Sequence, residues 1–174
     1  MFKYDVCIIG TGRVGLPLGL SLIEAGVKAV GVDVDDELRN SVNSGVMPFH
    51  EPGYEDVISR REFKVHGHAA DAVPESRFLI VTVGTPLHNH IETDLSQIQR
   101  VLEGLKEHLR TGQTFILRST VAPGTTEYVK KWIERNTEMK VGSDIRLAFC
   151  PERIAEGLAY KELKSLPQVV GGED

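Results

Sequence analysis

The fold is decided near the start of the chain, where residues 6–15 read VCIIGTGRVG. The first four residues are apolar and predict a short buried strand. Gly10, Gly12 and Gly15 then form a GxGxxG pattern, and a helical segment at 16–25 follows, with Gly26 as its stop. The pattern is a weak signal when it stands alone, but it becomes a strong one between a strand and a helix.

Each glycine of this turn has a separate physical task. Gly10 permits the tight turn, Gly12 lets the backbone approach a pyrophosphate closely, and Gly15 lets the helix pack near the strand. The free N–H groups at the helix start, together with the helix dipole, favour negative phosphates. The sequence therefore predicts a dinucleotide-binding turn of the Rossmann type. The alternative is a turn whose glycines are incidental.

The second expected strand, at 29–34, carries Asp33 near its carboxyl end. A carboxylate at this point accepts hydrogen bonds from the adenosine ribose and repels a 2′-phosphate, so we predict NAD in preference to NADP. Two alternatives stay open. Asp33 only begins a turn with Asp35 and Asp36, or the nearby Arg39 accepts a phosphate.

Apolar strands alternate with helical segments along the chain. Strands are expected at 6–9, 29–34, 63–66, 78–83, 114–117 and 145–149, and another begins at 169–170. Helices are expected at 16–25, after Asp35 as cap, at 55–59, at 94–110 with Asp94 and Gln97 as a capping box, and from Pro123–Gly124 through Ile133. The alternation predicts an α/β fold: a Rossmann-type doubly wound parallel sheet in a single domain spanning 1–174.

Composition excludes several other classes of protein. The 174 residues are 41% hydrophobic and 26% charged, with a net charge of −5, which argues weakly against nucleic acid as a partner. The sequence shows no long apolar run and no secretory signal, so no membrane association is expected. Cys7 and Cys150 stand at apolar strand positions and are expected to be buried thiols in a reducing cytoplasm. His88 and His90 are expected to be surface loop residues rather than metal ligands.

Several ordered motifs follow the glycine turn: Glu51–Pro52–Gly53, Thr85–Pro86, Ser119–Thr120–Val121, Pro123–Gly124–Thr125–Thr126, Cys150–Pro151–Glu152–Arg153 and 167–172 (PQVVGG). On these motifs nearly the whole chain resembles the N-terminal NAD-binding domain of the UDP-glucose/GDP-mannose dehydrogenase family. The resemblance is greatest to the UDP-N-acetyl-D-mannosamine dehydrogenase branch.

The resemblance implies oxidation of the C6 alcohol of a UDP-sugar to a carboxylate with two NAD⁺, through an aldehyde and a thiohemiacetal on a cysteine. The products of such enzymes generally feed surface polysaccharides. The family's nucleophilic cysteine lies far downstream, and Cys150 does not match its position. The central helix, through which family enzymes usually form homodimers, and the C-terminal UDP-sugar domain are absent from this chain. We therefore expect a fragment that binds NAD but does not oxidise a UDP-sugar alone.

The resemblance also assigns cofactor contacts, in addition to the three glycines, to Arg13, Val14, Asp33, Thr85, Thr120 and Glu156. Thr85 and Thr120 come just after expected strands, at the edge of the sheet where ligands bind. In the family the second threonine is also linked to a catalytic water. The alternatives are a turn residue before proline for Thr85 and a helix cap for Thr120.

Glu152 corresponds to a family carboxylate implicated in proton transfer or water positioning, which it can perform if desolvation favours its protonated form. The alternative is a charge at a helix start. Arg153 and Ile154 are expected to contact the sugar nucleotide, and Pro-Glu-Arg is typical of the branch that acts on N-acetylated sugars. A surface arginine is the alternative for Arg153. The expected substrate is a UDP-N-acetylhexosamine, UDP-N-acetylmannosamine first. UDP-glucose, or a non-catalytic NAD-binding or regulatory module, remains the alternative.

Overall fold

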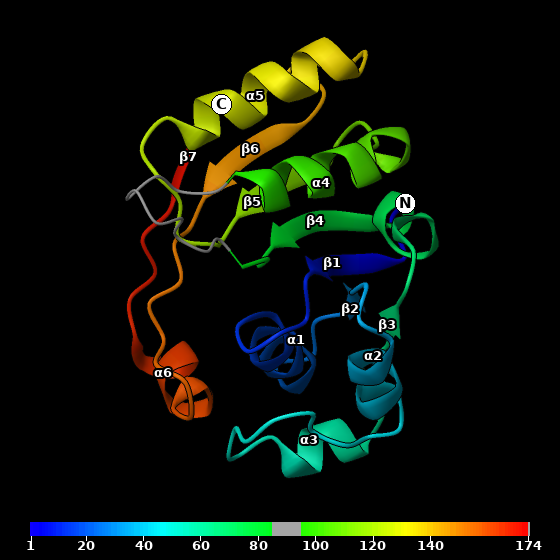
Figure 1. Ribbon diagram of the computed structural model, residues 1–174, viewed down its shortest axis with the longest axis vertical. Helices are drawn as coiled ribbons and strands as arrows, with labels where there is room; N and C mark the ends of the chain where they lie inside the picture. Colours follow the sequence, from blue (N-terminus) through cyan, green and yellow to red (C-terminus); the bar gives the residue numbers. More distant parts are fainter. Residues whose placement is uncertain (85–94, 174) are drawn as a thin grey trace.

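The computed structural model describes residues 1–84 and 95–173 (Figure 1). Within these residues seven strands form one sheet in the order β3-β2-β1-β4-β5-β6-β7. The strands are β1 (Tyr4–Ile9), β2 (Ala29–Val32), β3 (Val65–His66), β4 (Ser76–Val81), β5 (Thr114–Leu117), β6 (Arg146–Phe149) and β7 (Gly171–Glu173). The first six pair in parallel, and β7 pairs with β6 in the antiparallel sense.

Helices cover both faces of the sheet (Figure 1). They are α1 (Gly15–Glu24), α2 (Asp36–Asn43), α3 (Glu55–Ser59), α4 (Ser96–Leu105), α5 (Thr125–Asn136) and α6 (Ala159–Ser165), with short 3₁₀ turns at Ala69–Asp71, Val73–Glu75 and Lys106–His108. Apolar residues of α4 and α5 pack against one face, and those of α1, α2, α3 and α6 pack against the other. The prediction of a doubly wound α/β fold is confirmed.

Strand β1 shows why its sequence is apolar at every inner position. Val6 and Ile8 join the cluster that includes α1, whereas Cys7 and Ile9 join the cluster that includes α4 and α5. Successive side chains of a strand point to opposite faces, so a strand covered on both faces needs a continuous apolar run. The glycine turn therefore begins at the carboxyl end of a strand that is buried in the middle of the sheet.

The far end of the chain differs from expectation. Val169–Val170 are exposed and precede β7, whose direction is antiparallel, and α6 has no counterpart among the predicted helices. Two of the three residues of β7 are Gly171 and Gly172, so no alternation of apolar side chains marks the strand. Helix α6 fully buries only Ala159, which leaves too narrow an apolar stripe for periodicity to reveal.

Several element boundaries also shift. The strand expected at 78–83 runs from Ser76 to Val81, and the one expected at 63–66 keeps only its last two residues. The helix expected at 94–110 begins at Ser96 and is α-helical only to Leu105, after which it tightens into a 3₁₀ turn. Asp94, its expected cap, lies outside the described residues. Asp35 does cap α2, because its carboxylate accepts the Leu38 N–H at 3.0 Å.

Candidate cofactor site

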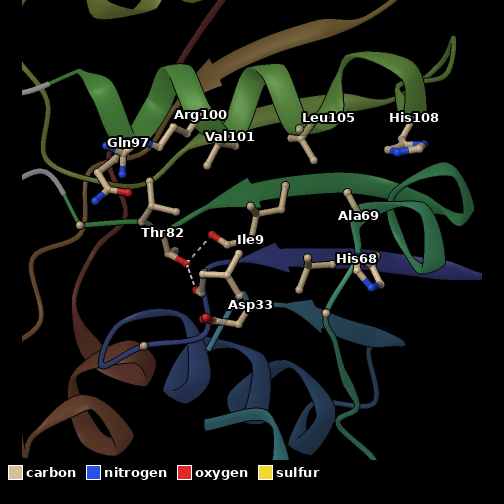
Figure 2. Close-up of a pocket in the computed structure, with 18 of the residues that line it drawn as sticks. Ile9, Asp33, His68, Ala69, Thr82, Gln97, Arg100, Val101, Leu105 and His108 are labelled. Atoms are coloured by element: carbon tan, nitrogen blue, oxygen red, sulfur yellow. Dashed lines mark hydrogen bonds between the residues drawn. The ribbon is translucent and has the colours of Figure 1, made fainter. Parts of the chain in front are cut away.

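A cavity of about 790 Å³ opens at the carboxyl ends of β1, β2 and β4, beside α4 (Figure 2). Here the sheet order reverses, because β1 leads outward to β2 on one side and β4 leads outward to β5 on the other. Ligands of open α/β sheets bind at such a switch point. The lining includes Ile9, Gly10, Gly12, Asp33, His68, Thr82, Gln97, Arg100, Val101, Leu105 and His108. Its size suits a small molecule or cofactor.

The glycine turn forms part of this cavity wall, and its three glycines differ in their surroundings. Gly10 has φ of +89°, which only glycine adopts without strain. A Cβ on Gly15 would lie 2.0 Å from the carbonyl oxygen of Gly10, so no side chain fits there. Around Gly12, by contrast, no described atom lies within 4 Å of a Cβ position. The turn thus leaves open the side that a pyrophosphate needs, and the residues present fit a dinucleotide.

Thr82, at the end of β4, braces this turn. Its hydroxyl lies 3.2 Å from the carbonyl oxygen of Ile9 and 2.5 Å from that of Gly10 (Figure 2). Ser119, after β5, donates a comparable hydrogen bond to the carbonyl of Val83 at 2.6 Å. Sequence reasoning missed both residues. Their signal is a small hydroxyl side chain one or two residues after an apolar strand.

Asp33 lies half-buried at the cavity and is already hydrogen-bonded. Its Oδ2 accepts the backbone N–H of Thr11 at 2.6 Å and lies 3.2 Å from the Thr11 hydroxyl. Its Oδ1 accepts the N–H of Asp35 at 3.0 Å. Asp33 therefore begins a turn with Asp35 and also lines the cavity, so the two interpretations of this residue are compatible.

Arg39 is the alternative acceptor of a phosphate. Its guanidinium donates to the carbonyl oxygen of Asp33 at 2.9 Å and pairs with the Asp36 carboxylate. The side chain is only 19% exposed, and it packs against Gly67. Its donors are thus engaged by the chain's own oxygens, which weighs against a role in holding a 2′-phosphate.

The structure describes only one of the two threonines that are expected to contact the cofactor. Thr85 lies outside the described residues. Thr120 is exposed three residues beyond β5, near the edge of the sheet where the cavity opens. Helix α5 is preceded by Gly124 as its N-cap, so the interpretation of Thr120 as a helix cap is wrong.

Glu152 is buried in an ion pair that the sequence did not suggest. The Nε and Nη2 atoms of Arg118 lie 2.7 and 2.5 Å from Glu152 Oε2, and both side chains are less than 10% exposed. Glu152 stands in an irregular segment and α6 begins only at Ala159, so its interpretation as a helix-start charge is wrong. Arg118 directly follows the apolar residues of β5, and that abrupt change is the signal that could have identified it.

The second oxygen of Glu152 organises the residues after it. Oε1 accepts the backbone N–H groups of Arg153 at 2.7 Å and Ile154 at 3.0 Å. The exposed Arg153 guanidinium donates to the carbonyl oxygen of Pro167, and Ile154 is partly buried. The two expected substrate residues are therefore neighbours in one turn whose backbone Glu152 holds.

Two of the expected cofactor residues meet beside the glycine turn. The guanidinium of Arg13 lies 3.4 Å from the Glu156 carboxylate, with both side chains more than half exposed, and 5.3 Å from the ring of Phe49. Val14, the N-cap residue of α1, is partly buried next to them. The loop that carries Glu156 is tied down by the buried Glu51, which accepts the N–H of Gly157 at 2.8 Å and that of Ala159 at 2.9 Å.

The cysteines behave as expected, since both are free and buried. Burial raises the pKa of the Cys7 thiol to about 12, which leaves it unreactive near neutrality. Within residues 1–84 and 95–173, no cluster of three metal-ligating side chains occurs. Of the helices in this part of the chain, none has the length and apolarity to cross a membrane. His88 and His90 lie outside the described residues.

Known proteins resemble this chain in sequence and in architecture. Residues 4–174 match the family model described as the NAD binding domain of the UDP-glucose/GDP-mannose dehydrogenase family. The UDP-N-acetyl-D-mannosamine dehydrogenase of Pyrococcus horikoshii is 32% identical over 96% of this chain and 40% of its own length. The UDP-glucose 6-dehydrogenase of Bacillus subtilis is 28% identical over 96% of this chain and 37% of its own. The chain thus spans about two-fifths of the length of these relatives.

Solved structures agree with the sequence comparison. The GDP-mannose dehydrogenase of Pseudomonas aeruginosa superposes with a TM-score of 0.92 at 30% identity, covering 98% of this chain and 41% of that one. The UDP-D-ManNAc dehydrogenase of Pyrococcus horikoshii gives 0.89 at 32% identity, covering 97% and 41%. With a switch-point cavity, a glycine turn open at Gly12 and a family match over residues 4–174, the chain belongs to the UDP-glucose/GDP-mannose dehydrogenase family, as its NAD-binding domain.

Proposed function

We propose that the chain is the NAD-binding part of a nucleotide-sugar 6-dehydrogenase that oxidises the C6 alcohol of a UDP-N-acetylhexosamine, UDP-N-acetylmannosamine first, to the uronic acid with two NAD⁺. One observation carries the proposal: the family match over residues 4–174 coincides with a cavity built on the predicted glycine turn. In this proposal a central helix and a C-terminal UDP-sugar domain, which complete the enzyme, lie outside residues 1–174.

NAD⁺ supplies the hydride acceptor when it is bound. On the chain's side, the backbone of Gly10–Gly15 would hold the pyrophosphate at the open side of Gly12, and Asp33 would accept hydrogen bonds from the adenosine ribose. Arg13 and Val14, which lie within this turn, and Glu156, which pairs with Arg13, would contact the cofactor. In this proposal Thr120 would contact the nicotinamide half, together with Thr85, which lies outside the described residues.

Thr120 and Glu152 are the proposed catalytic residues. The exposed Thr120 holds a water molecule, and Glu152 positions water or carries a proton, while Arg153 and Ile154 contact the sugar nucleotide. Support comes from the burial of the Glu152 carboxylate and from its hydrogen bonds to the turn that carries Arg153 and Ile154. A buried carboxylate with fixed neighbours is suited to hold a water molecule or a neighbouring group in one position.

The substrate proposal rests on the Pro151–Glu152–Arg153 motif and on the names of relatives. Proteins called UDP-N-acetyl-D-mannosamine dehydrogenases are 32% and 31% identical to the chain. UDP-glucose is the second candidate, because a UDP-glucose 6-dehydrogenase is also similar at 28% identity. The test measures NADH formed by the intact enzyme from each UDP-sugar. We expect UDP-N-acetylmannosamine to give the highest kcat/KM, and turnover of UDP-glucose alone would select the second candidate. An enzyme that oxidises no UDP-sugar would reject both.

We further propose that the intact enzyme is a homodimer in the cytoplasm, formed through the central helix. The two free buried thiols agree with a reducing compartment. Light scattering of the intact enzyme checks the dimer, and a monomer at micromolar concentration would contradict it.

A further inference from the structure

A buried ion pair joins the segments that follow β5 and β6. The side chain of Arg118 is 6% exposed and that of Glu152 is 8% exposed. Two guanidinium nitrogens of Arg118 approach the same carboxylate oxygen, at 2.7 and 2.5 Å. The backbone N–H of Glu152 also donates to the carbonyl oxygen of Arg118 at 2.9 Å. Side chain and backbone therefore hold the two segments in one relative position.

The third nitrogen of the guanidinium extends the contact to other parts of the chain. Nη1 of Arg118 lies 3.0 Å from the Gln168 side-chain oxygen and 3.0 Å from the sulfur of Cys150. Gln168 precedes β7, and Cys150 directly follows β6. Every nitrogen of this guanidinium thus has a partner, so its plane is fixed in the protein.

Fixing one oxygen of Glu152 also fixes the direction of the other. Oε1 points to the N–H groups of Arg153 and Ile154, which it accepts at 2.7 and 3.0 Å. A carboxylate without the planar partner at Oε2 would rotate away from these two N–H groups more easily. The order of the 152–154 turn therefore depends on Arg118, which is distant from it in sequence.

We propose that Arg118 is a positioning residue, which orients the Glu152 carboxylate and, through it, the turn bearing Arg153 and Ile154. The proposal rests on the proposed function, in which Glu152 takes part in catalysis and the turn contacts the sugar nucleotide. Lysine separates this role from simple neutralisation of charge. It supplies one point charge to Glu152, but it lacks the rigid planar group that fixes the carboxylate plane.

The first experiment measures amide hydrogen exchange on the 174-residue chain. In R118K, exchange of the Arg153 and Ile154 amides rises about tenfold or more, while the Gly10–Gly15 turn keeps its rates. The matched control is R146K, an exposed arginine at the start of β6, which leaves all of these rates unchanged. Unchanged rates at residues 153 and 154 in R118K would overturn the proposal.

A second variant keeps the test decisive if R118K does not fold. The double variant R118M/E152Q removes both charges together, so that neither is buried alone. The amide that replaces the Glu152 carboxylate lacks the planar partner, and the backbone N–H groups of Arg153 and Ile154 exchange about tenfold faster than in the wild type. Protection equal to that of the wild type would again overturn the proposal.

The second experiment measures steady-state kinetics of the intact enzyme. R118K lowers kcat/KM for the UDP-sugar about tenfold or more and leaves the KM for NAD⁺ unchanged, because the Arg118 guanidinium bonds to Glu152, Cys150 and Gln168 rather than to the cofactor turn. Wild-type kinetics in R118K, despite faster exchange, would overturn the positioning role. If the wild-type enzyme oxidises no UDP-sugar, the proposed function fails, and the exchange experiment still decides whether Arg118 orders the turn.

Discussion

Among single residues, Gly12 and Gly15 give opposite predictions for replacement by alanine. Gly12→Ala leaves the fold intact, since its Cβ meets no described atom within 4 Å, but the methyl occupies the space of the pyrophosphate. Affinity for NAD⁺ then falls about tenfold or more, by calorimetry. Gly15→Ala places a methyl 2.0 Å from the Gly10 carbonyl oxygen and lowers the free energy of unfolding by about 3 kcal/mol, by thermal denaturation. If Gly12→Ala lowered the stability and left the affinity for NAD⁺ unchanged, the open side of Gly12 would not be the pyrophosphate site.

Asp33 carries the prediction about cofactor choice. The wild-type chain binds NAD⁺ more tightly than NADP⁺, because the carboxylate repels a 2′-phosphate. Asp33→Asn keeps an acceptor for the Thr11 N–H but loses the charge, so the ratio of the two dissociation constants narrows about tenfold. Titration calorimetry with both cofactors measures this. Glu37→Gln, exposed on α2, is the control that keeps the wild-type ratio. Tighter binding of NADP⁺ by the wild type would contradict the prediction.

The positions of residues that depend on local context could be predicted from the sequence, and contacts between distant partners could not. Gly10, Gly12 and Asp33 follow from strand–turn–helix spacing, which the sequence shows directly. Arg118 is hydrogen-bonded to Glu152, which lies 34 positions away, and Thr82 is hydrogen-bonded to Gly10, which lies 72 positions away. A single sequence does not reveal which distant residues the fold brings together.

Among the structural elements, the loop before α6 depends on one buried carboxylate. Glu51 is 3% exposed and accepts the N–H groups of Gly157 and Ala159. Glu51→Ala leaves both donors without this partner and lowers the free energy of unfolding by about 3 kcal/mol. Urea denaturation measures the loss. The exposed Glu55, at the start of α3, provides the control Glu55→Ala, with a much smaller effect. Equal losses in both variants would show that Glu51 has no special role.

Strand β1 gives a prediction of pH dependence. Burial raises the pKa of Cys7 from 9.0 to about 12, although a hydrogen bond to Ser76 opposes the shift. Because the folded pKa is the higher one, the stability that the neutral thiol contributes is complete below pH 9 and is lost as pH rises toward 12. The advantage in unfolding free energy of the wild type over Cys7→Ala then shrinks by about 2 kcal/mol between pH 8 and pH 10.5. Urea titrations at both pH values measure it, and a constant difference would mean that the thiol is not shielded.

Most elements that were predicted correctly have a broad apolar face, whereas α2, which fully buries only Val42, was predicted from its cap, Asp35. Strands β1, β2, β4 and β5 and helices α1 and α5 appear near their expected positions because the core needs their side chains. Helix α6 and strand β7 are fixed instead by contacts of particular residues. Tyr160 donates to Glu24 at 2.9 Å, and Lys164 pairs with the same carboxylate at 2.7 Å, which docks α6 on the end of α1. Such pairs leave no periodic trace in the sequence.

For the molecule as a whole, the sheet and its two apolar clusters lie within these 174 residues. The proposed oxidation also requires a nucleophilic cysteine and a UDP-sugar domain, which in the proposal lie outside them. We therefore expect the chain alone to bind NAD⁺ and to produce no NADH from any UDP-sugar. Calorimetry and absorbance at the NADH band measure the two properties on one preparation. UDP-sugar-dependent NADH formation by the 174-residue chain would contradict the assignment of the nucleophile and sugar site to segments outside it.

The hydrogen bonds from Thr11 to Asp33 and from Thr82 to the turn join groups of the protein to one another. Much of the conformational entropy needed to shape the turn is therefore lost during folding rather than during association. We then expect the cofactor to bind a preorganised site, with a single-exponential association phase and no slower ordering step. Asp33 already accepts hydrogen bonds from Thr11 and Asp35. We therefore expect its contact with the ribose to contribute less to the binding enthalpy than a carboxylate without such partners would.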